Sequence, residues 1–490
     1  MKKFAKKILY FIASLAIIYL LLLIPDAKQK STGTQTGKKP FAWNRDAQWL
    51  RMEELFKQAK IMDTLKLDSL ITVYKNIAEK EFSFLNKNTT AVDSGWIKTE
   101  NNFFILASLV AVKQTQMPWM IDYYNRVRNL VKKQSQQWDI NNVETRNTIY
   151  TLLYGLRAAV EEVLLQTDSL HFSAAMLVNN EKSATPAASI FGIEAHSGDL
   201  LVSRGGAEVS ALISRGNDYP GNFSHIALIY VDEKTNDPFL IEAHIEKGVA
   251  IASVAQYEND KKLRFMVMRP RADLPLMLAD SMLPQEAAKR MFNEAGKRHI
   301  RYDFKMNFND TLEMFCSEVA SYAYRTNGLQ IWKYPSTISS QGVVKWLHDF
   351  GVENFVTQMP SDLEYDPQLA VVAEWRHPQT LFKDHIDNAV MDALLQKANQ
   401  GKIIEYNIWQ LPIVRVIKGY CIIKNMFGNM GMIPEGMSAT KALKNQSFVA
   451  MHVDVKNKTM QMADEFFNQN GYRAPYWQLV KFAEAAANEK

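Results

Sequence analysis

One cysteine, one histidine and one glutamate have the types and the order needed for a nucleophile, a base and an orienting acid. Cys316 follows three residues able to cap a helix, Asn309, Asp310 and Thr311. We therefore expect Cys316 in the first turns of a helix, where the helix dipole favours a thiolate. The alternative is a buried cysteine that packs as a small hydrophobic side chain.

The histidine and the glutamate lie in two neighbouring apolar stretches. His225 opens the stretch 225–231, Glu242 lies within 239–244, and a polar turn separates the two, so we expect a hairpin. A carboxylate inside an apolar strand is costly without a partner, and an imidazole is a natural one, because the acid fixes its tautomer. His244 is two residues beyond Glu242 and shares its face, which makes it the alternative third member. His225 could instead be a satisfied sheet-edge histidine.

Several other kinds of chemistry lack their motifs. The chain has no HExxH, GxSxG, GxGxxG or P-loop sequence, which argues against a zincin, an α/β-hydrolase, a Rossmann enzyme and a P-loop NTPase. Its two cysteines make neither a disulfide framework nor a cysteine zinc site. We expect no metal and no organic cofactor. The net charge is +5, but residues 1–40 hold eight lysines and one acid, so the body is nearly neutral and no nucleic-acid partner is expected.

The N-terminus has the clearest compositional signal. Four lysines in residues 1–7 precede Ile8–Ile24, an uncharged apolar run of 17 residues. This pattern predicts a membrane anchor with the body on the extracytoplasmic, periplasmic side. A cleaved signal peptide, giving a secreted form, is the competing interpretation, and a buried soluble helix is a third. Residues 27–40 are polar and predict a flexible tether.

Helical periodicity covers most of the body, but the pattern changes near residue 180. Between 181 and 350, short β-like runs alternate with turn residues, and helices are expected at about Gln285–Gly296 and Thr311–Arg325, which together indicate an α+β domain. The β-like runs are Leu200–Ser203, Ile226–Val231, Leu240–His244, Val249–Ser253 and Leu263–Met268. The expected division is an anchor or signal at 1–26, the tether at 27–40, a helical domain at 41–180, the α+β domain at 181–350 and a mainly helical region at 351–490.

Five stretches of the α+β region, taken in order, resemble a known family. They are SGDLLVSRG at 197–205, FSHIAL at 223–228, IEA at 241–243, YDF at 302–304 and FCSEV at 315–319. They look like the YiiX/YebB-like cysteine hydrolases of the NlpC/P60 superfamily, the circularly permuted papain-like branch with an antiparallel sheet. In that branch the histidine precedes the cysteine, as it does here.

The resemblance implies a role for each residue. Cys316 would be the nucleophile, His225 the general base and Glu242 the orienting acid. Tyr302 and Asp303 match a family motif: the tyrosine could lend its hydroxyl near an oxyanion or simply pack, and the aspartate could cap a turn. The reaction would be acyl transfer through a thioester. His225 would take the thiol proton, or the pair would rest as a thiolate and an imidazolium.

These features leave three functions open. The first is an exported, membrane-tethered thiol hydrolase that cleaves an amide bond, a peptidase or amidase acting on peptides or peptidoglycan-derived peptides. The second is a lipid-directed hydrolase or acyltransferase, since the permuted branch includes enzymes similar to lecithin–retinol acyltransferase. The third is a non-catalytic binding module on a helical scaffold. Specificity in such folds lies in loops and flanking regions, so the substrate stays open.

Overall fold

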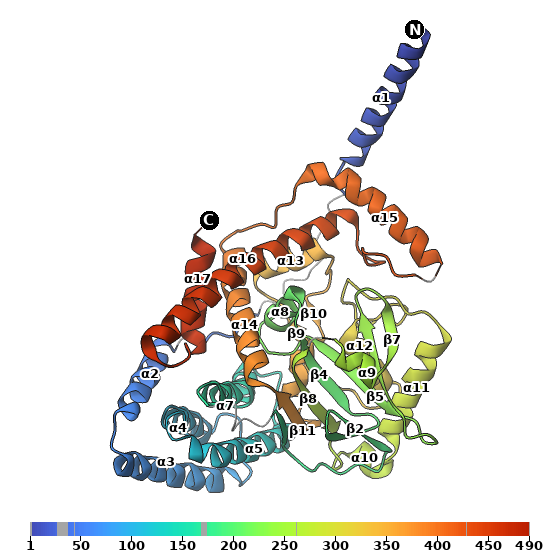
Figure 1. The fold of residues 1–490 in the computed structure, drawn as a ribbon. Helices are drawn as coiled ribbons and strands as arrows, with labels where there is room; N and C mark the ends of the chain where they lie inside the picture. Colours follow the sequence, from blue (N-terminus) through green and yellow to red (C-terminus); the bar gives the residue numbers. More distant parts are fainter. Residues whose placement is uncertain are drawn as a thin grey trace.

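The computed structural model describes residues 2–26, 38–43, 45–167, 174–260, 262–427 and 429–489. Most of the expected tether, 27–37, lies outside the described residues. A long antiparallel sheet is surrounded by helices from both halves of the chain, and the first helix projects away from this body (Figure 1). The expected α+β class with an antiparallel sheet is confirmed.

The expected membrane span is wrong. Across the parts of the chain that the structure describes, no helix combines the length and the apolar character needed to cross a membrane. The first helix, α1 (Lys2–Leu22), carries lysines at its start and ends at Leu22. Its apolar part from Ile8 onward is therefore only about 22 Å long, against a hydrocarbon core of about 30 Å. The membrane anchoring, and the extracytoplasmic location that depended on it, are not supported.

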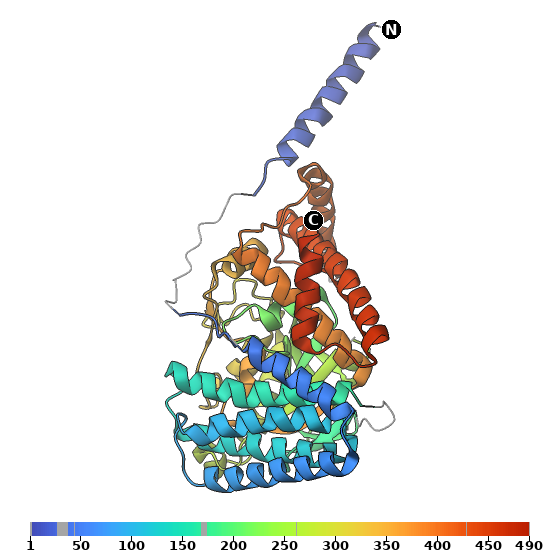
Figure 2. The ribbon, with the colours of Figure 1, turned by 90° about the vertical axis from the view of Figure 1, so that its left-hand side faces the viewer.

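A layer of helices precedes the sheet. Polar caps begin several of them: the Asp63 carboxylate accepts the N–H groups of Leu65 and Lys66, and Asn142 caps the sixth helix in the same way. Figure 2 shows these helices stacked side by side. They are α2 (Asp46–Lys60), α3 (Thr64–Leu85), α4 (Ser94–Val110), α5 (Met117–Gln134), α6 (Val143–Tyr150) and α7 (Leu156–Leu165).

The central sheet has seven antiparallel strands in the order β1-β11-β8-β4-β5-β6-β7. Hydrophobic side chains of β4, β5 and β8 are buried on both faces, so these strands form the middle of the fold. The strands are β1 (Ala175–Leu177), β4 (Leu200–Gly205), β5 (His225–Val231), β6 (Pro238–His244), β7 (Gly248–Ser253), β8 (Lys262–Pro270) and β11 (Leu369–Arg376). Two short pairs accompany them: β2 (Ala187–Ile190) with β3 (Ile193–His196), and β9 (Ser336–Thr337) with β10 (Val356–Thr357).

Five of the seven strands match the β-like runs of the sequence, and two do not. Strand β11 lies beyond residue 350, in a region where the sequence predicts mainly helix, and it pairs with β8 on one side and β1 on the other. Its residues are buried on both faces, so it lacks the alternating pattern that identifies a half-exposed strand. The sheet therefore continues past the expected end of the α+β region.

Helices lie over one face of the sheet. α11 (Leu283–Lys297) and α12 (Cys316–Arg325) pack against β5 and its neighbours, while α14 (Pro378–Asn399) packs on β8. The other face is covered by the β2–β3 hairpin and by α9 (Val254–Glu258). The remaining helices are α8 (Glu208–Arg215), α10 (Pro275–Ala279), α13 (Gln341–Phe350), α15 (Leu411–Met426), α16 (Ala439–Asn470) and α17 (Tyr476–Asn488).

The helix that bears the cysteine begins later than expected. The sequence predicts its start at about Thr311, but α12 begins at Cys316. Asp310 caps a local turn by accepting the N–H of Leu312, and the N–H of Met314 bonds to the carbonyl of Arg301. These bonds hold residues 310–314 out of the helix, so the predicted caps serve a loop and Cys316 becomes the first helical residue.

Candidate active site

Cys316 occupies the first position of α12, against the start of β5. Its side chain is 5% exposed, and its thiol donates a long hydrogen bond of 3.9 Å to the carbonyl oxygen of Ser224. Burial raises the pKa of Cys316 to about 11, although the backbone N–H of Ile226 and those of Cys316 and Ser317 stabilise the thiolate. The resting side chain is therefore a neutral thiol near pH 7.

His225, Glu242 and His244 form a hydrogen-bonded group on β5 and β6. His225 Nε2 lies 2.6 Å from Glu242 Oε2, and His244 Nε2 lies 2.9 Å from Glu242 Oε1. Burial by itself would raise the pKa of Glu242, but the two imidazoles lower it well below its usual range. Burial also lowers the pKa of His225, by more than Glu242 raises it. The group at neutral pH is an ionised carboxylate beside a neutral imidazole, which is the form of a base ready to accept a proton.

The expected hairpin explains why these three side chains meet. Ala227 pairs with Glu242 across the antiparallel strands, and paired residues point to the same face. His225 lies two residues before Ala227, and His244 two residues after Glu242, so all three share that face. A seven-residue strand alone would not bring them together; the register of β5 against β6 does.

The Cys316 side chain contacts the backbone on either side of His225. Sγ contacts the Ser224 carbonyl and the Ile226 N–H, which flank His225 on both sides. α12 packs on the face of the sheet that bears Ile226, whereas the His225 face belongs to a different core cluster. Among the described residues, no hydrogen bond joins the thiol to the imidazole directly. The two parts of the site therefore meet at His225, the first residue of β5.

Glu242 occupies only one of the two ring nitrogens of His225. Because Nε2 is engaged by Glu242, Nδ1 is left for a second partner. Nδ1 is the ring nitrogen closer to the residue's own backbone, and the sulfur lies against that backbone on both sides. Catalytic hydrogen bonds are often long in ligand-free structures and shorten when substrate binds.

The two matched motif residues take different places. Burial raises the pKa of Tyr302 well above its usual range, and the nearby Cys316 adds to this effect, so the phenol is a close neighbour of the cysteine. Asp303 faces its own loop, where its carboxylate accepts the N–H groups of Lys305 and Asn307 at 2.7 and 2.6 Å. Asp303 therefore shapes the loop that carries Tyr302.

The sequence analysis gave no role to Glu318, which lies two residues after Cys316 in α12. Its Oε2 accepts the N–H of Phe315 at 2.9 Å and so satisfies one of the unpaired groups at the helix start. Burial raises the pKa of Glu318 to about 9, which keeps the carboxyl neutral at pH 7. No extra negative charge is therefore placed beside a developing thiolate. The signal was present as an acid in the third helical position, but it is readable only when the helix start is known.

A buried ionic network fixes the helices to the sheet beside this site. Glu161 on α7 lies within 3.5 Å of Arg157, Arg264 and Arg376, and within 3.3 Å of His385. The arginines, in turn, meet further acids from β11, from the segment before it and from α14. The other members are Arg128, Arg204, Glu364, Glu374 and Asp384.

Replacing Glu161 by glutamine should destabilise the fold strongly. The change leaves three buried guanidinium groups short of one negative charge, which costs about 3–5 kcal/mol in comparable buried pairs. The free energy of unfolding in urea measures this loss. Glu79→Gln is the control, because its pair with Arg126 is partly exposed and such pairs contribute about 0–1 kcal/mol. Equal losses in the two variants would contradict a structural role for the network.

A metal site is a separate question. Within the described ranges, no group of three or more His, Cys, Asp and Glu side chains is arranged to hold a metal ion.

The fold and the site together define a class. A helix that begins with a cysteine packs on an antiparallel sheet, and a histidine–carboxylate pair lies on earlier strands. This is a papain-like domain in which the histidine precedes the cysteine, the permuted arrangement.

The comparison with protein families gives the more specific answer. Residues 194–373 match the model of the permuted papain-like amidase enzymes, YaeF/YiiX, C92 family. This match confirms the resemblance to YiiX-like proteins, and that family implies an amidase or peptidase of the cysteine type. The match begins in β3 and ends in β11, so it includes the strand that the sequence pattern missed. No curated protein matches the chain.

Proposed function

We propose that this protein is a thiol amidase that hydrolyses amide bonds in peptides, with peptides derived from peptidoglycan as the favoured substrate class. The carrying observation is the contact of Cys316 Sγ with the backbone on both sides of His225, whose imidazole is held by Glu242. The amidase family of residues 194–373 supports the reaction type and leaves the peptide open.

The first half of the reaction forms a thioester. His225 Nδ1 takes the proton of the Cys316 thiol while the sulfur attacks the amide carbonyl carbon. The carbonyl oxygen becomes an oxyanion, and the backbone N–H groups of Cys316 and Ser317 at the open start of α12 lie at the sulfur and serve as donors to it. The C–N bond then breaks, and the imidazolium returns the proton to the leaving amine.

The second half regenerates the thiol. His225 removes a proton from water, the hydroxide oxygen attacks the thioester carbonyl, and the C–S bond breaks. The sulfur leaves as a thiolate and takes the proton back from His225, so the products are a carboxylic acid and an amine. Glu242 stays ionised throughout and stabilises the imidazolium in both halves.

The pKa of Cys316 makes the proton-transfer route testable. With a pKa of about 11, only about 0.01% of the thiol is ionised at pH 7, so no resting ion pair is needed. The rate of alkylation of Cys316 by iodoacetamide should rise about tenfold for each pH unit up to about pH 10, read by peptide mass spectrometry. Cys421, which is also buried, is the internal control for local unfolding. A rate that levels off below pH 8 would show instead a preformed thiolate–imidazolium pair.

The substrate class is tested by turnover. Purified protein is incubated with a panel of peptide amides, a panel of peptidoglycan-derived peptides and a panel of lipid esters, and products are identified by mass spectrometry. We expect hydrolysis within the two peptide panels only. Turnover confined to lipid esters would replace the proposal by a lipid-directed hydrolase, and absence of turnover with intact reactivity of Cys316 would favour a binding module.

A further inference from the structure

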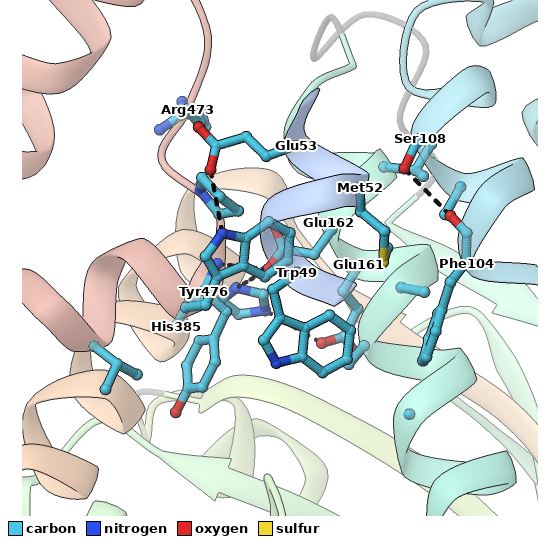
Figure 3. Close-up of a pocket in the computed structure, with 18 of the residues that line it drawn as sticks. Trp49, Met52, Glu53, Phe104, Ser108, Glu161, Glu162, His385, Arg473 and Tyr476 are labelled. Carbon is cyan, nitrogen blue, oxygen red and sulfur yellow. Dashed lines mark hydrogen bonds and ion pairs between the residues drawn. The ribbon is translucent and has the colours of Figure 1, made fainter. Parts of the chain in front are cut away.

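A cavity of about 420 Å³ lies between α2, α4, α7, α14 and α17. Most of the residues that line it lie outside the segment 194–373 that matches the family. Figure 3 shows Trp49, Met52, Phe104, Glu162 and His385 gathered around it. The cavity is of the size that takes small organic ligands, and none of the roles assigned above to Cys316, His225 or Glu242 uses it.

The apolar part of the wall is aromatic. The rings of Trp49 and Trp477 stack at 5.7 Å with an angle of 9°, and Phe104 and Trp43 meet Trp49 edge-on. Trp49 and Trp477 lie more than 400 residues apart in the chain. Trp43, Trp49 and Trp477 are only partly buried, whereas Phe104 is buried. Partly exposed tryptophan faces that converge on one concave surface favour an apolar ligand body or a cation over the ring.

Three of the acids that line the cavity, Asp46, Glu162 and Glu484, form no ion pair with Lys or Arg among the described residues. Glu162 is the one that lies beside His385. Glu161 is neutralised by three arginines, but its neighbour Glu162 has no Lys or Arg within ion-pair distance among the described residues. Glu162 accepts the backbone N–H of Tyr476 at 3.0 Å, and burial raises its pKa.

His385 is incompletely satisfied beside it. The side chain is about 96% buried, and its Nε2 lies 3.3 Å from Glu161. Its Nδ1 lies 3.7 Å from Glu162, too far for a hydrogen bond, and has no partner in the described part of the chain. The cavity therefore presents an unmatched carboxylate and an unsatisfied imidazole nitrogen within one aromatic-walled space.

Two of the three cations that line the cavity are already engaged, and the third, Lys481, is exposed. Arg215 makes two bonds to Asp392, at 2.7 and 2.8 Å. The guanidinium of Arg473 lies 4.6 Å from the centre of the Phe382 ring. An anionic ligand beside Arg215 or Arg473 would have to displace these partners, whereas a cationic ligand would supply the charge that Glu162 lacks.

We infer that this cavity binds an organic ammonium compound, with its charged nitrogen at Glu162 and its apolar body against Trp49 and Trp477. The site is distinct from the proposed hydrolytic centre, and its test needs no amidase activity.

The test uses three probes of one shape and different charge, 4-phenylbutylamine, 4-phenylbutan-1-ol and 4-phenylbutanoate, titrated calorimetrically into the full chain at pH 7.5. We expect the amine to bind at least tenfold more tightly than the alcohol, and the acid to bind weakest. Glu162→Gln should abolish the preference for the amine and leave the affinity for the alcohol unchanged. Glu484→Gln, which removes another acid of the same wall, should retain the preference.

A second variant separates the aromatic wall from the charge. Trp49→Leu should weaken the binding of the amine and of the alcohol to a similar extent. The folding control is an unfolding midpoint close to that of the parent protein. The inference is overturned if none of the probes binds saturably, if the three bind equally, if the acid binds best, or if Glu162→Gln keeps the preference for the amine.

Discussion

Cys316→Ala should abolish amide hydrolysis, with kcat reduced at least about 10⁴-fold. In the proposed reaction the sulfur is the atom that forms the covalent bond to the substrate, and it lies at the start of α12 beside the His225 backbone. Losing the nucleophile of a triad leaves only the contribution of the oxyanion donors and of substrate binding. The measurement is single-turnover kinetics on the best peptide amide, combined with intact-protein mass spectrometry to detect the acylated enzyme.

The matched control is Cys421→Ala, which removes the other buried cysteine. Cys421 lies in α15 and has no place in the proposed reaction, so this variant should retain turnover and the acyl adduct. The Cys316→Ala protein should show no adduct while unfolding at nearly the same urea concentration as the parent. Normal turnover by Cys316→Ala would contradict the nucleophile assignment and favour the binding-module alternative.

Glu242→Gln should reduce kcat by roughly 10³- to 10⁴-fold with a smaller effect on KM. Glutamine has nearly the same shape, but it carries no charge to stabilise the imidazolium and can present an N–H to His225, which disfavours the productive tautomer. The loss is thus in the transition state rather than in substrate binding.

The pH profile separates this role from a structural one. In the parent protein, kcat/KM should fall as the pH drops through the pKa of His225, which burial places below its usual value of 6.5. Glu242 raises that pKa, so its removal should move the acidic limb to still lower pH. A Glu242→Gln variant with reduced activity and an unmoved acidic limb would show that the carboxylate does not act through His225.

His244→Gln tests whether Glu242 acts in the reaction through His225 or through His244. His244 shares Glu242 but is farther from β5, so its loss should cost less than tenfold in kcat. A larger loss for His244→Gln than for His225→Gln would exchange their roles.

Part of this site could be read from the sequence because its determinants are local. The apolar runs at 225–231 and 239–244 and the polar turn between them predict a two-stranded hairpin, and the period of two then places Glu242 and His244 on one face. The order of the histidine and the cysteine, with the five matching stretches, gave the family. These features depend on near neighbours in the chain, and side-chain spacing is enough to infer them.

Other parts could not be read from local pattern. The sequence suggested caps at 309–311, but Asp310 is used in a turn with Leu312 and Met314 bonds to Arg301, so Cys316 starts the helix. An apolar run of 17 residues predicted a membrane span, yet α1 ends at Leu22 and no described helix meets the requirement for crossing a membrane. In each case the boundary of the helix, which the composition does not specify, decided the outcome.

The sequence by itself therefore determined the α+β class, the hairpin that joins His225 to Glu242, and the family of residues 194–373. Only the tertiary structure decided that Cys316 rests as a buried neutral thiol and that Glu161 is matched by three arginines while Glu162 is not. The physical reason is that burial and charge compensation depend on residues brought together from distant parts of the chain. Strand β11, Trp49 on α2 and Trp477 on α17 acquire their roles only when these distant segments pack together.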